Sequence, residues 1–420
     1  MRISTYALAT ALAGFAFAAT ATAQNYGGAR PQKKEEVVEK AAESTEGKKL
    51  KISPKAQKAI VELQTAVNAN DTAAIPEKLA AAQKVAESPD EKYFVAVNQL
   101  KAALNANDLA AAQVGLQAME ASGGGDTATL VGQYSNLGVK YYEKKQIDQA
   151  GAAFEKAVAL DANNPSATKL LGSIRDMQGR KAEAITLLQK SLTLTKAAGQ
   201  NPKESDYKFA AKLAYETKSP ASVEITRSWL SDYPTATNWR DALRIYRDIN
   251  AIEGESKIDV MRLARAANAL NGEGDYFGYA TELVSRGHLN EAKAVIDEGG
   301  AKKAIDVNNN VFKQFAPKFA KMPTRAAIDA SAKTALAGGS AKGAMDAGDA
   351  LYGVGAFGEA APLYKAAASR GGDANTANLR LGMALARSGD KAGATAALNA
   401  VTGAQANTAK YWLIWLNTQG

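Results

Sequence analysis

The chain has 420 residues, 46% of them apolar and 7% aromatic, and a formal net charge of +8. This length exceeds what one compact core needs, so we expect several domains or a repeat array. With no cysteine and a single histidine, His288, the composition excludes disulfides, thiol nucleophiles and zinc sites built from cysteine or paired histidines.

The first residues have the pattern of a bacterial secretory signal. A short positive start precedes an apolar run at residues 6–19, and small residues at 21–23 suit a signal peptidase. The apolar run is too short to remain as a membrane span, and no later stretch reaches that length. We therefore expect residues 1–23 to be cleaved and the protein to be periplasmic or extracellular. Residues 24–50 are charged and poor in large apolar side chains, which predicts a disordered tail.

Two similar segments follow the tail. Residues 63–71 (LQTAVNAND) match residues 100–108 (LKAALNAND). In each, the final Asp is placed to cap the next helix, because its side chain can accept hydrogen bonds from free backbone N–H groups. We predict two divergent helical hairpins over 52–122, followed by a glycine-rich break.

Further along the chain, small and large residues recur at a spacing of 34 positions. Gly138 matches Gly172, and nearer the C-terminus Gly348 matches Gly382. Residues 134–164 (YSNLGVKYYEKKQIDQAGAAFEKAVALDANN) place Leu-Gly and Tyr on one predicted helix and Ala, Phe and Ala on the next. Small residues let two helices approach closely while the aromatic rings fill the space between them.

This pattern resembles the tetratricopeptide repeat family, most strongly at 131–198 and 341–408. The resemblance implies an all-α fold, a right-handed superhelical solenoid of stacked antiparallel helix pairs. The repeat at 307–340 fits least well, because Gln314 stands where a small residue belongs. The resemblance divides the chain into repeats, degenerate repeats, further repeats and a capping helix, at 131–235, 236–340, 341–408 and 409–420.

In this family, positions five, nine and twelve of the first helix of each repeat face a concave groove that binds ligands. At these positions the resemblance implies a basic stripe made of Lys169, Lys208, Lys212, Arg240, Arg244 and Arg247. Such a stripe would hold an acidic or carboxylate-bearing protein or peptide by charge-assisted hydrogen bonds. The asparagines of the family's carboxylate clamp are missing, since Ser135 and Val139 occupy the corresponding places. A solvated charged face without a ligand is the alternative.

The last helix is apolar around most of its circumference. Trp412 and Trp415 occupy packing positions, which predicts a closing helix against the repeat at 375–408. An end cap should present a polar face to water, and Tyr411 and Ile414 do not. Contact of these two residues with a partner or a second copy is therefore the competing hypothesis.

Two apparent signals of chemistry have simpler interpretations. Residues 353–358 match the G-x-G-x-x-G pattern, but that motif requires a preceding strand, whereas here it falls between two predicted helices. His288 follows a turn glycine and has no carboxylate or hydroxyl partner at a recognisable spacing. We predict no catalytic residue, no cofactor and no metal site.

These features together predict a non-enzymatic periplasmic scaffold that holds a partner protein in a basic groove. Two alternatives stay open. An enzyme acting on cell-wall or polysaccharide material would need a converging carboxylate pair, and binding of an anionic polysaccharide would need only positive charge. Nucleic acid is not expected, because the chain is predicted to be secreted and has few aromatic stacking platforms. The sequence leaves the oligomeric state open.

Overall fold

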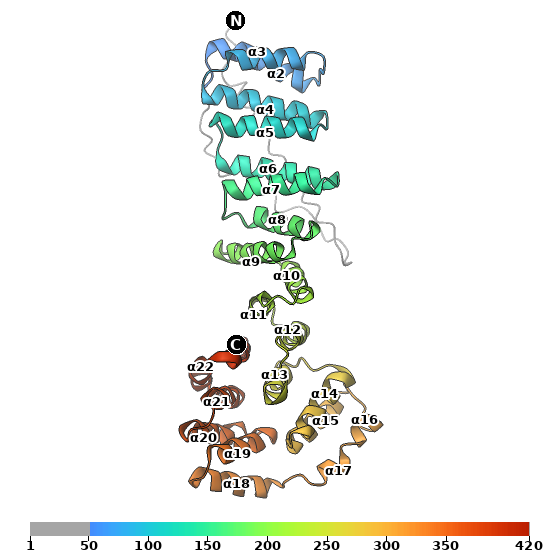
Figure 1. The fold of residues 1–420 in the computed structure, drawn as a ribbon, viewed down its shortest axis with the longest axis vertical. Coiled ribbons are helices and arrows are strands. Elements are labelled where there is room, and N and C mark those ends of the chain that lie inside the picture. Colours follow the sequence, from blue (N-terminus) through green and yellow to red (C-terminus); the bar gives the residue numbers. More distant parts are fainter. Residues whose placement is uncertain (1–50, 420) are drawn as a thin grey trace. The chain divides into compact units, whose positions relative to one another are not determined.

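The computed structural model describes residues 51–419, and all the regular elements in this range are helical (Figure 1). The all-α prediction is therefore confirmed, and antiparallel helix pairs are the recurring unit. Within 51–419, each helix is too short or too polar to serve as a membrane span. The predicted signal peptide at 1–23 and the predicted tail at 24–50 lie outside the described residues.

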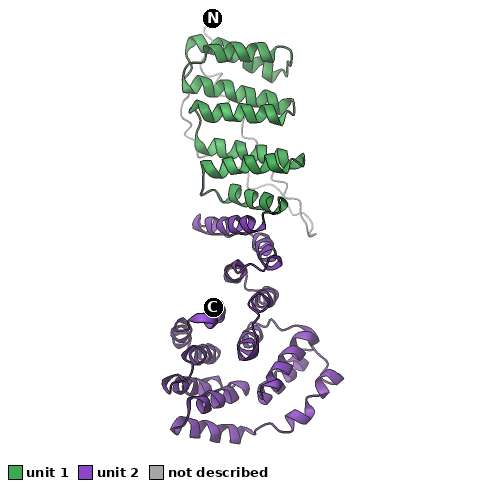
Figure 2. Cartoon of the chain, in the orientation of Figure 1, with its two compact units in different colours: residues 1–180 green, residues 181–420 purple. Residues whose placement is uncertain are grey.

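The chain divides into two compact units, residues 1–180 and 181–420 (Figure 2). The described part of the first unit is a series of helical hairpins with one further helix. The segment 52–122, for which the sequence predicts two hairpins, holds the first four helices. The helices of this unit are α2 (Pro54–Asn68), α3 (Ile75–Val85), α4 (Pro89–Asn105), α5 (Leu109–Ser122), α6 (Thr127–Glu143), α7 (Ile147–Leu160) and α8 (Pro165–Met177).

The two Asn-Ala-Asn-Asp turns have the same local structure. Asn70 and Asn107 have φ values of 53° and 55°, a left-handed conformation that asparagine tolerates better than most residues. Asp71 and Asp108 follow, and each side chain accepts a hydrogen bond from the backbone N–H three residues later, at 3.1 and 2.9 Å. At Asp108 this bond caps α5, as the sequence predicts. The bond of Asp71 instead closes a turn before α3, which begins at Ile75 with Ala74 at its N-cap.

Glycine sets the distance between the two helices of a repeat. At three equivalent positions, a Cβ atom added to the glycine would come within 2.5–2.8 Å of a large side chain sixteen residues later. Real Cβ atoms do not approach neighbours so closely, so these positions require glycine. The pairs are Gly138 with Phe154, Gly348 with Tyr364, and Gly382 with Leu398.

The second unit consists of helix pairs interrupted by one irregular segment. We call Glu204–Ala301 the first arm and Ala341–Asn417 the second arm. The helices of this unit are α9 (Lys181–Ala197), α10 (Glu204–Glu216), α11 (Ala221–Asp232), α12 (Ala236–Ile249), α13 (Gly254–Ala266), α14 (Gly272–Ser285), α15 (Leu289–Ala301), α16 (Asn310–Lys313), α17 (Ala316–Phe319), α18 (Arg325–Ala337), α19 (Ala341–Gly353), α20 (Phe357–Ser369), α21 (Ala374–Ser388), α22 (Lys391–Asn399) and α23 (Ala406–Asn417), with a short 3-10 turn at Gly403–Gln405.

The hairpin predicted at 307–340 does not form. Two four-residue helices, α16 and α17, stand where its first helix was expected, and α18 alone follows them. Pro317 and Pro323 interrupt the stretch, and proline cannot continue a helix in its interior. Phe312 and Phe315 are buried next to the ring of Phe277 of α14, at centroid distances of 6.3 and 5.8 Å. The segment is therefore a packed connection between the two arms.

The two arms of the second unit pack against each other. Helix α23 contacts α11 and α13, and α19 contacts α15. In Figure 1 the C-terminus accordingly lies near α11–α13. One apolar core contains Trp239 and Leu263 of the first arm together with Tyr411 and Trp412 of the second. The closing helix therefore covers more than its neighbouring repeat, because it also joins the two ends of the unit.

Candidate functional site

Three predicted arginines come together in a cleft on the first arm. Helix α12 begins after Thr235, whose side chain accepts a hydrogen bond from the Asn238 N–H at 3.2 Å. Arg240, Arg244 and Arg247 are four and three residues apart, so they lie on one face of α12. This face is opposite the buried side of the helix. A cleft of about 220 Å³, which we call the arginine cleft, is lined by polar groups of Arg240, Asp241, Arg244, Arg247 and Asp275 and by apolar side chains of Leu243, Val260, Met261 and Leu270.

The arginine cleft keeps a modest positive charge. The Nε atom of Arg240 donates to Asp275 at 2.8 Å, and Arg244 lies 3.8 Å from Asp241. Among residues 51–419, the guanidinium of Arg247 has no ion-pair partner. Three guanidinium groups thus face two carboxylates. The two aspartates hold two of the arginines in position and leave the third available.

The rest of the predicted stripe is weaker than the sequence suggests. Lys208 and Lys212 lie on α10 outside the arginine cleft, and each has a glutamate one helical turn away. Lys208 is 2.9 Å from Glu204, and Lys212 is 3.7 Å from Glu216. Lys169 is half-buried on α8 of the first unit, whereas the arginine cleft belongs to the second unit alone.

The predicted contact of Tyr411 and Ile414 is made with the chain itself. Tyr411 is fully buried, and its hydroxyl lies 2.6 Å from Oγ1 of Thr226 on α11. Ile414 is half-buried against the same core. The partner-contact hypothesis is therefore wrong for Tyr411, because Thr226 bonds its hydroxyl and the ring of Tyr246 lies 5.0 Å from its own.

A cluster of buried charges joins the two arms, and sequence reasoning missed it. Arg262 of α13 lies 2.7 Å from Glu291 of α15 and 3.2 Å from Asp349 of α19. Arg380 of α21 lies 2.6 Å from Asp349 and 3.1 Å from Asp259 of α13. All five residues are at most 5% exposed. We call these residues the ion cluster.

The pKa values in the ion cluster reflect burial and pairing. Burial by itself would raise the pKa of Glu291, but the charge of Arg262 and hydrogen bonds from Arg262 and Tyr279 lower it on balance. For Asp259, burial outweighs the two arginines and raises the pKa. The sequence shows acidic and basic residues on one face of α13, but their partners lie on helices too distant to be read from spacing.

The single histidine does have a carboxylate partner. The Nε2 atom of His288 is 3.3 Å from both carboxylate oxygens of Glu255 on α13, which corrects the prediction of an unpartnered turn histidine. Glu255, His288 and Asp349 are close enough to share a metal ion. Arg380, however, contacts both carboxylates, at 2.7 and 2.6 Å, so a guanidinium already supplies the positive charge at this place. The converging carboxylates are therefore paired and do not form a free acid–base pair.

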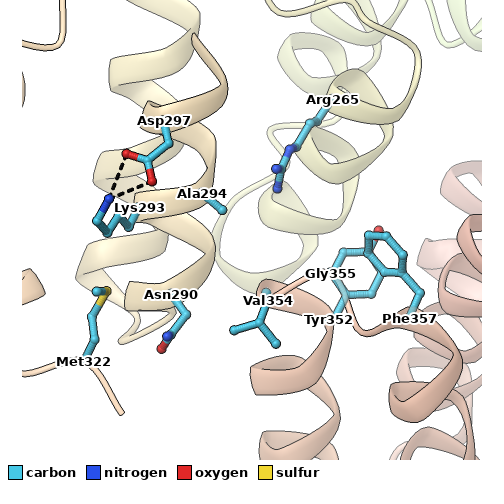
Figure 3. Close-up of a pocket in the computed structure, with 11 residues that line it drawn as sticks. Arg265, Asn290, Lys293, Ala294, Asp297, Met322, Tyr352, Val354, Gly355 and Phe357 are labelled. Atoms are coloured by element: carbon cyan, nitrogen blue, oxygen red, sulfur yellow. Dashed lines mark hydrogen bonds and ion pairs between the residues drawn. The ribbon is translucent and has the colours of Figure 1, made fainter. Parts of the chain in front are cut away.

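A second cleft, of about 300 Å³, lies between α15 and the turn from α19 to α20 (Figure 3). Asn290 and Lys293 line one side, and Val354 and Phe357 line the other. Lys293 is paired with Asp297 at 2.6 Å. The glycine motif at 353–358 forms this turn between two helices. The N–H groups of residues 354 and 355 already bond to carbonyls of α19, at 3.3 and 3.0 Å, so they are not free to bind a phosphate.

A model of one repeat family matches two segments of the chain. The tetratricopeptide repeat family matches residues 136–202 and 345–409. A tetratricopeptide repeat protein from Parabacteroides merdae aligns with a TM-score of 0.29 and 12% identity over 70% of this chain and 99% of that one. The Naa15/Naa10 structure bound to HypK-THB aligns with a TM-score of 0.24 and 12% identity over 83% of this chain and 69% of that one. No curated protein matches the sequence.

Proposed function

We propose that this chain, two segments of which match tetratricopeptide repeats, is an interaction scaffold whose arginine cleft binds an acidic or carboxylate-bearing segment of a partner protein. Stacked helix pairs of this kind offer extended surfaces for holding other proteins. The observation that supports the proposal is that Arg240, Arg244 and Arg247 line one cleft together with apolar side chains.

The arginine cleft has the two components that a peptide site needs. Guanidinium groups bind carboxylates through paired hydrogen bonds, which are stronger than bonds between neutral groups. The floor formed by Leu243, Met261 and Leu270 can take an apolar side chain next to that carboxylate. Asp275 restrains Arg240 before a ligand arrives, which lowers the entropy lost on binding.

The binding proposal is tested with the double variant Arg244→Gln/Arg247→Gln. Charge-assisted hydrogen bonds contribute about 1.5–3 kcal/mol each, so affinity for acidic peptides should fall about tenfold or more. Fluorescence anisotropy with a panel of acidic peptides, each with a free or an amidated C-terminus, measures this. Binding of the wild-type chain should also weaken as ionic strength rises through the physiological range.

The control is Lys333→Gln/Lys365→Gln, which removes the same charge from two exposed positions outside the cleft. Equal losses in the two double variants would attribute binding to net charge alone. Unchanged affinity in the arginine variant would remove the cleft from the function.

We further propose that the protein acts in the periplasm or outside the cell, where the partner would be an envelope or secreted protein. The support is the apolar run at 6–19 followed by small residues at 21–23. Mass spectrometry of the protein from its native host should give a mature chain beginning at Gln24. Recovery of the full-length chain from the cytoplasm would contradict this location.

A further inference from the structure

Equivalent helix positions differ in exposure between the two arms. On α12, the side chains of Arg240 and Arg244 are 46% and 57% exposed. Of the four corresponding positions on α19 and α21, Asp349, Leu379 and Met383 are at most 5% exposed. The fourth, Met345, is half-buried. The face that is open in the first arm is therefore covered in the second arm.

Helix α13 of the first arm reaches this face through its charged side chains. Its residues Glu255, Asp259 and Arg262 are four and three positions apart, so they form one stripe. Glu255 and Asp259 pair with Arg380 of α21 at 2.7 and 3.1 Å. Arg262 pairs with Asp349 of α19 at 3.2 Å, and its guanidinium lies 4.5 Å from the ring centre of Tyr352. Each charged residue of the stripe thus contacts the covered face.

This contact is more polar than an ordinary protein core. Burying two arginines and three carboxylates costs desolvation free energy, which offsets much of their electrostatic attraction. The Oδ2 atom of Asp259 and the indole N–H groups of Trp412 and Trp415 are buried and have no hydrogen-bond partner within residues 51–419. An interface between domains has this character, and the two arms are joined by residues 302–340, which are irregular up to residue 324 and then form α18.

We propose that the face of α19 and α21 is a groove for a helix that carries two carboxylates one turn apart followed by an arginine, and that α13 of the same chain is its resident ligand. The arms separate transiently, and the groove then becomes accessible without unfolding of either arm. A partner helix with the charge pattern of α13 competes for the same groove. This site is distinct from the arginine cleft and does not depend on it.

Thiol labelling of the full chain tests the proposal, because the sequence contains no cysteine. Met383→Cys places a thiol in the groove, and Ala280→Cys places one in the core inside the first arm; both native side chains are fully buried. Under native conditions, the thiol at position 383 should react about tenfold faster than the thiol at 280, because local opening needs less free energy than global unfolding. Equal reaction at the rate of global unfolding would overturn the proposal.

Two arginines of α21 provide a matched comparison. Arg380→Ala removes the ion pairs with Glu255 and Asp259 between the arms, whereas Arg387→Ala removes the stacking on Phe357 within the second arm, at 4.7 Å. Arg380→Ala should accelerate labelling at position 383 and leave position 280 unchanged. Acceleration by Arg387→Ala to the same extent would overturn the proposal. The comparison of the two thiols in the otherwise wild-type chain decides the question if Arg380→Ala does not fold.

A synthetic peptide of residues 250–270 probes the groove directly. It should slow labelling at position 383, because it occupies the groove when the arms separate. The same peptide with Asp259→Ala and Arg262→Ala should have no effect. Failure of the first peptide to protect the thiol would refute a helix-binding groove, even if the arms do open.

Discussion

At the scale of single residues, glycine controls how closely paired helices approach. Gly382 lies against Leu398, and a Cβ atom at this position would be 2.5 Å from the leucine Cγ. Gly278 on α14 is also a glycine inside a helix, but a Cβ atom there would meet nothing within 4 Å. The first glycine is required by packing, whereas the second only lowers the helix propensity.

Alanine at these two positions should have opposite effects on stability. Gly382→Ala should lower the free energy of unfolding by about 1–3 kcal/mol, because the added methyl overfills the core. Gly278→Ala should raise it by about 0.5–1 kcal/mol, because alanine loses less backbone entropy in a helix. Urea denaturation followed by circular dichroism measures both. Stabilisation by Gly382→Ala would show that the helices of the last repeat can move apart freely.

At the scale of elements, α23 ties the second arm to the first through a few polar bonds in an apolar contact. The Tyr411 hydroxyl lies 2.6 Å from Thr226, and the Tyr246 hydroxyl lies 3.0 Å from Thr408. Tyr246 and Tyr411 also face each other with ring centres 5.0 Å apart. Buried hydroxyl groups need such partners, so the bonds favour one docking position of α23.

Removing one hydroxyl tests the importance of this docking. Tyr411→Phe should cost about 1 kcal/mol of unfolding free energy, because it leaves part of the Thr226 hydrogen-bonding capacity unused. Tyr215→Phe is the matched control, since its hydroxyl bonds to Asp248 at the surface, at 3.0 Å. That change should stay within about 0.5 kcal/mol. Equal losses in thermal or chemical unfolding would mean that burial of the bond is irrelevant.

At the scale of the whole molecule, the ion cluster and Glu255 make stability depend on pH. A hydrogen bond with His288 and the charge of Arg380 outweigh burial and lower the pKa of Glu255 from 4.5 to about 2. A depressed pKa stabilises the fold above about pH 4.5, and this contribution is lost as the pH falls through 2. The contribution of Asp259 changes with pH in the opposite direction. Burial raises its pKa, so this residue favours the folded state more as the pH falls.

Glu255→Gln isolates the first of these contributions. The wild-type chain should lose unfolding free energy more steeply than the variant between pH 4.5 and pH 2. Denaturant titrations at a series of pH values give both curves. Parallel curves would show that Glu255 is not ionised against Arg380 and His288 in the folded chain.

The helices, several of their ends and the close glycine contacts could be predicted from local sequence, because each depends on residues within one repeat. The Asn-Ala-Asn-Asp turns and the pair Gly138 and Phe154 are examples. The sequence also identified the three arginines of α12 as one face. Which helix faces are covered could not be predicted in this way: Tyr411 contacts Thr226, and Arg380 contacts Asp259, across more than a hundred residues. Such contacts follow from the way one arm packs on the other, and a 34-residue periodicity carries no information about that packing.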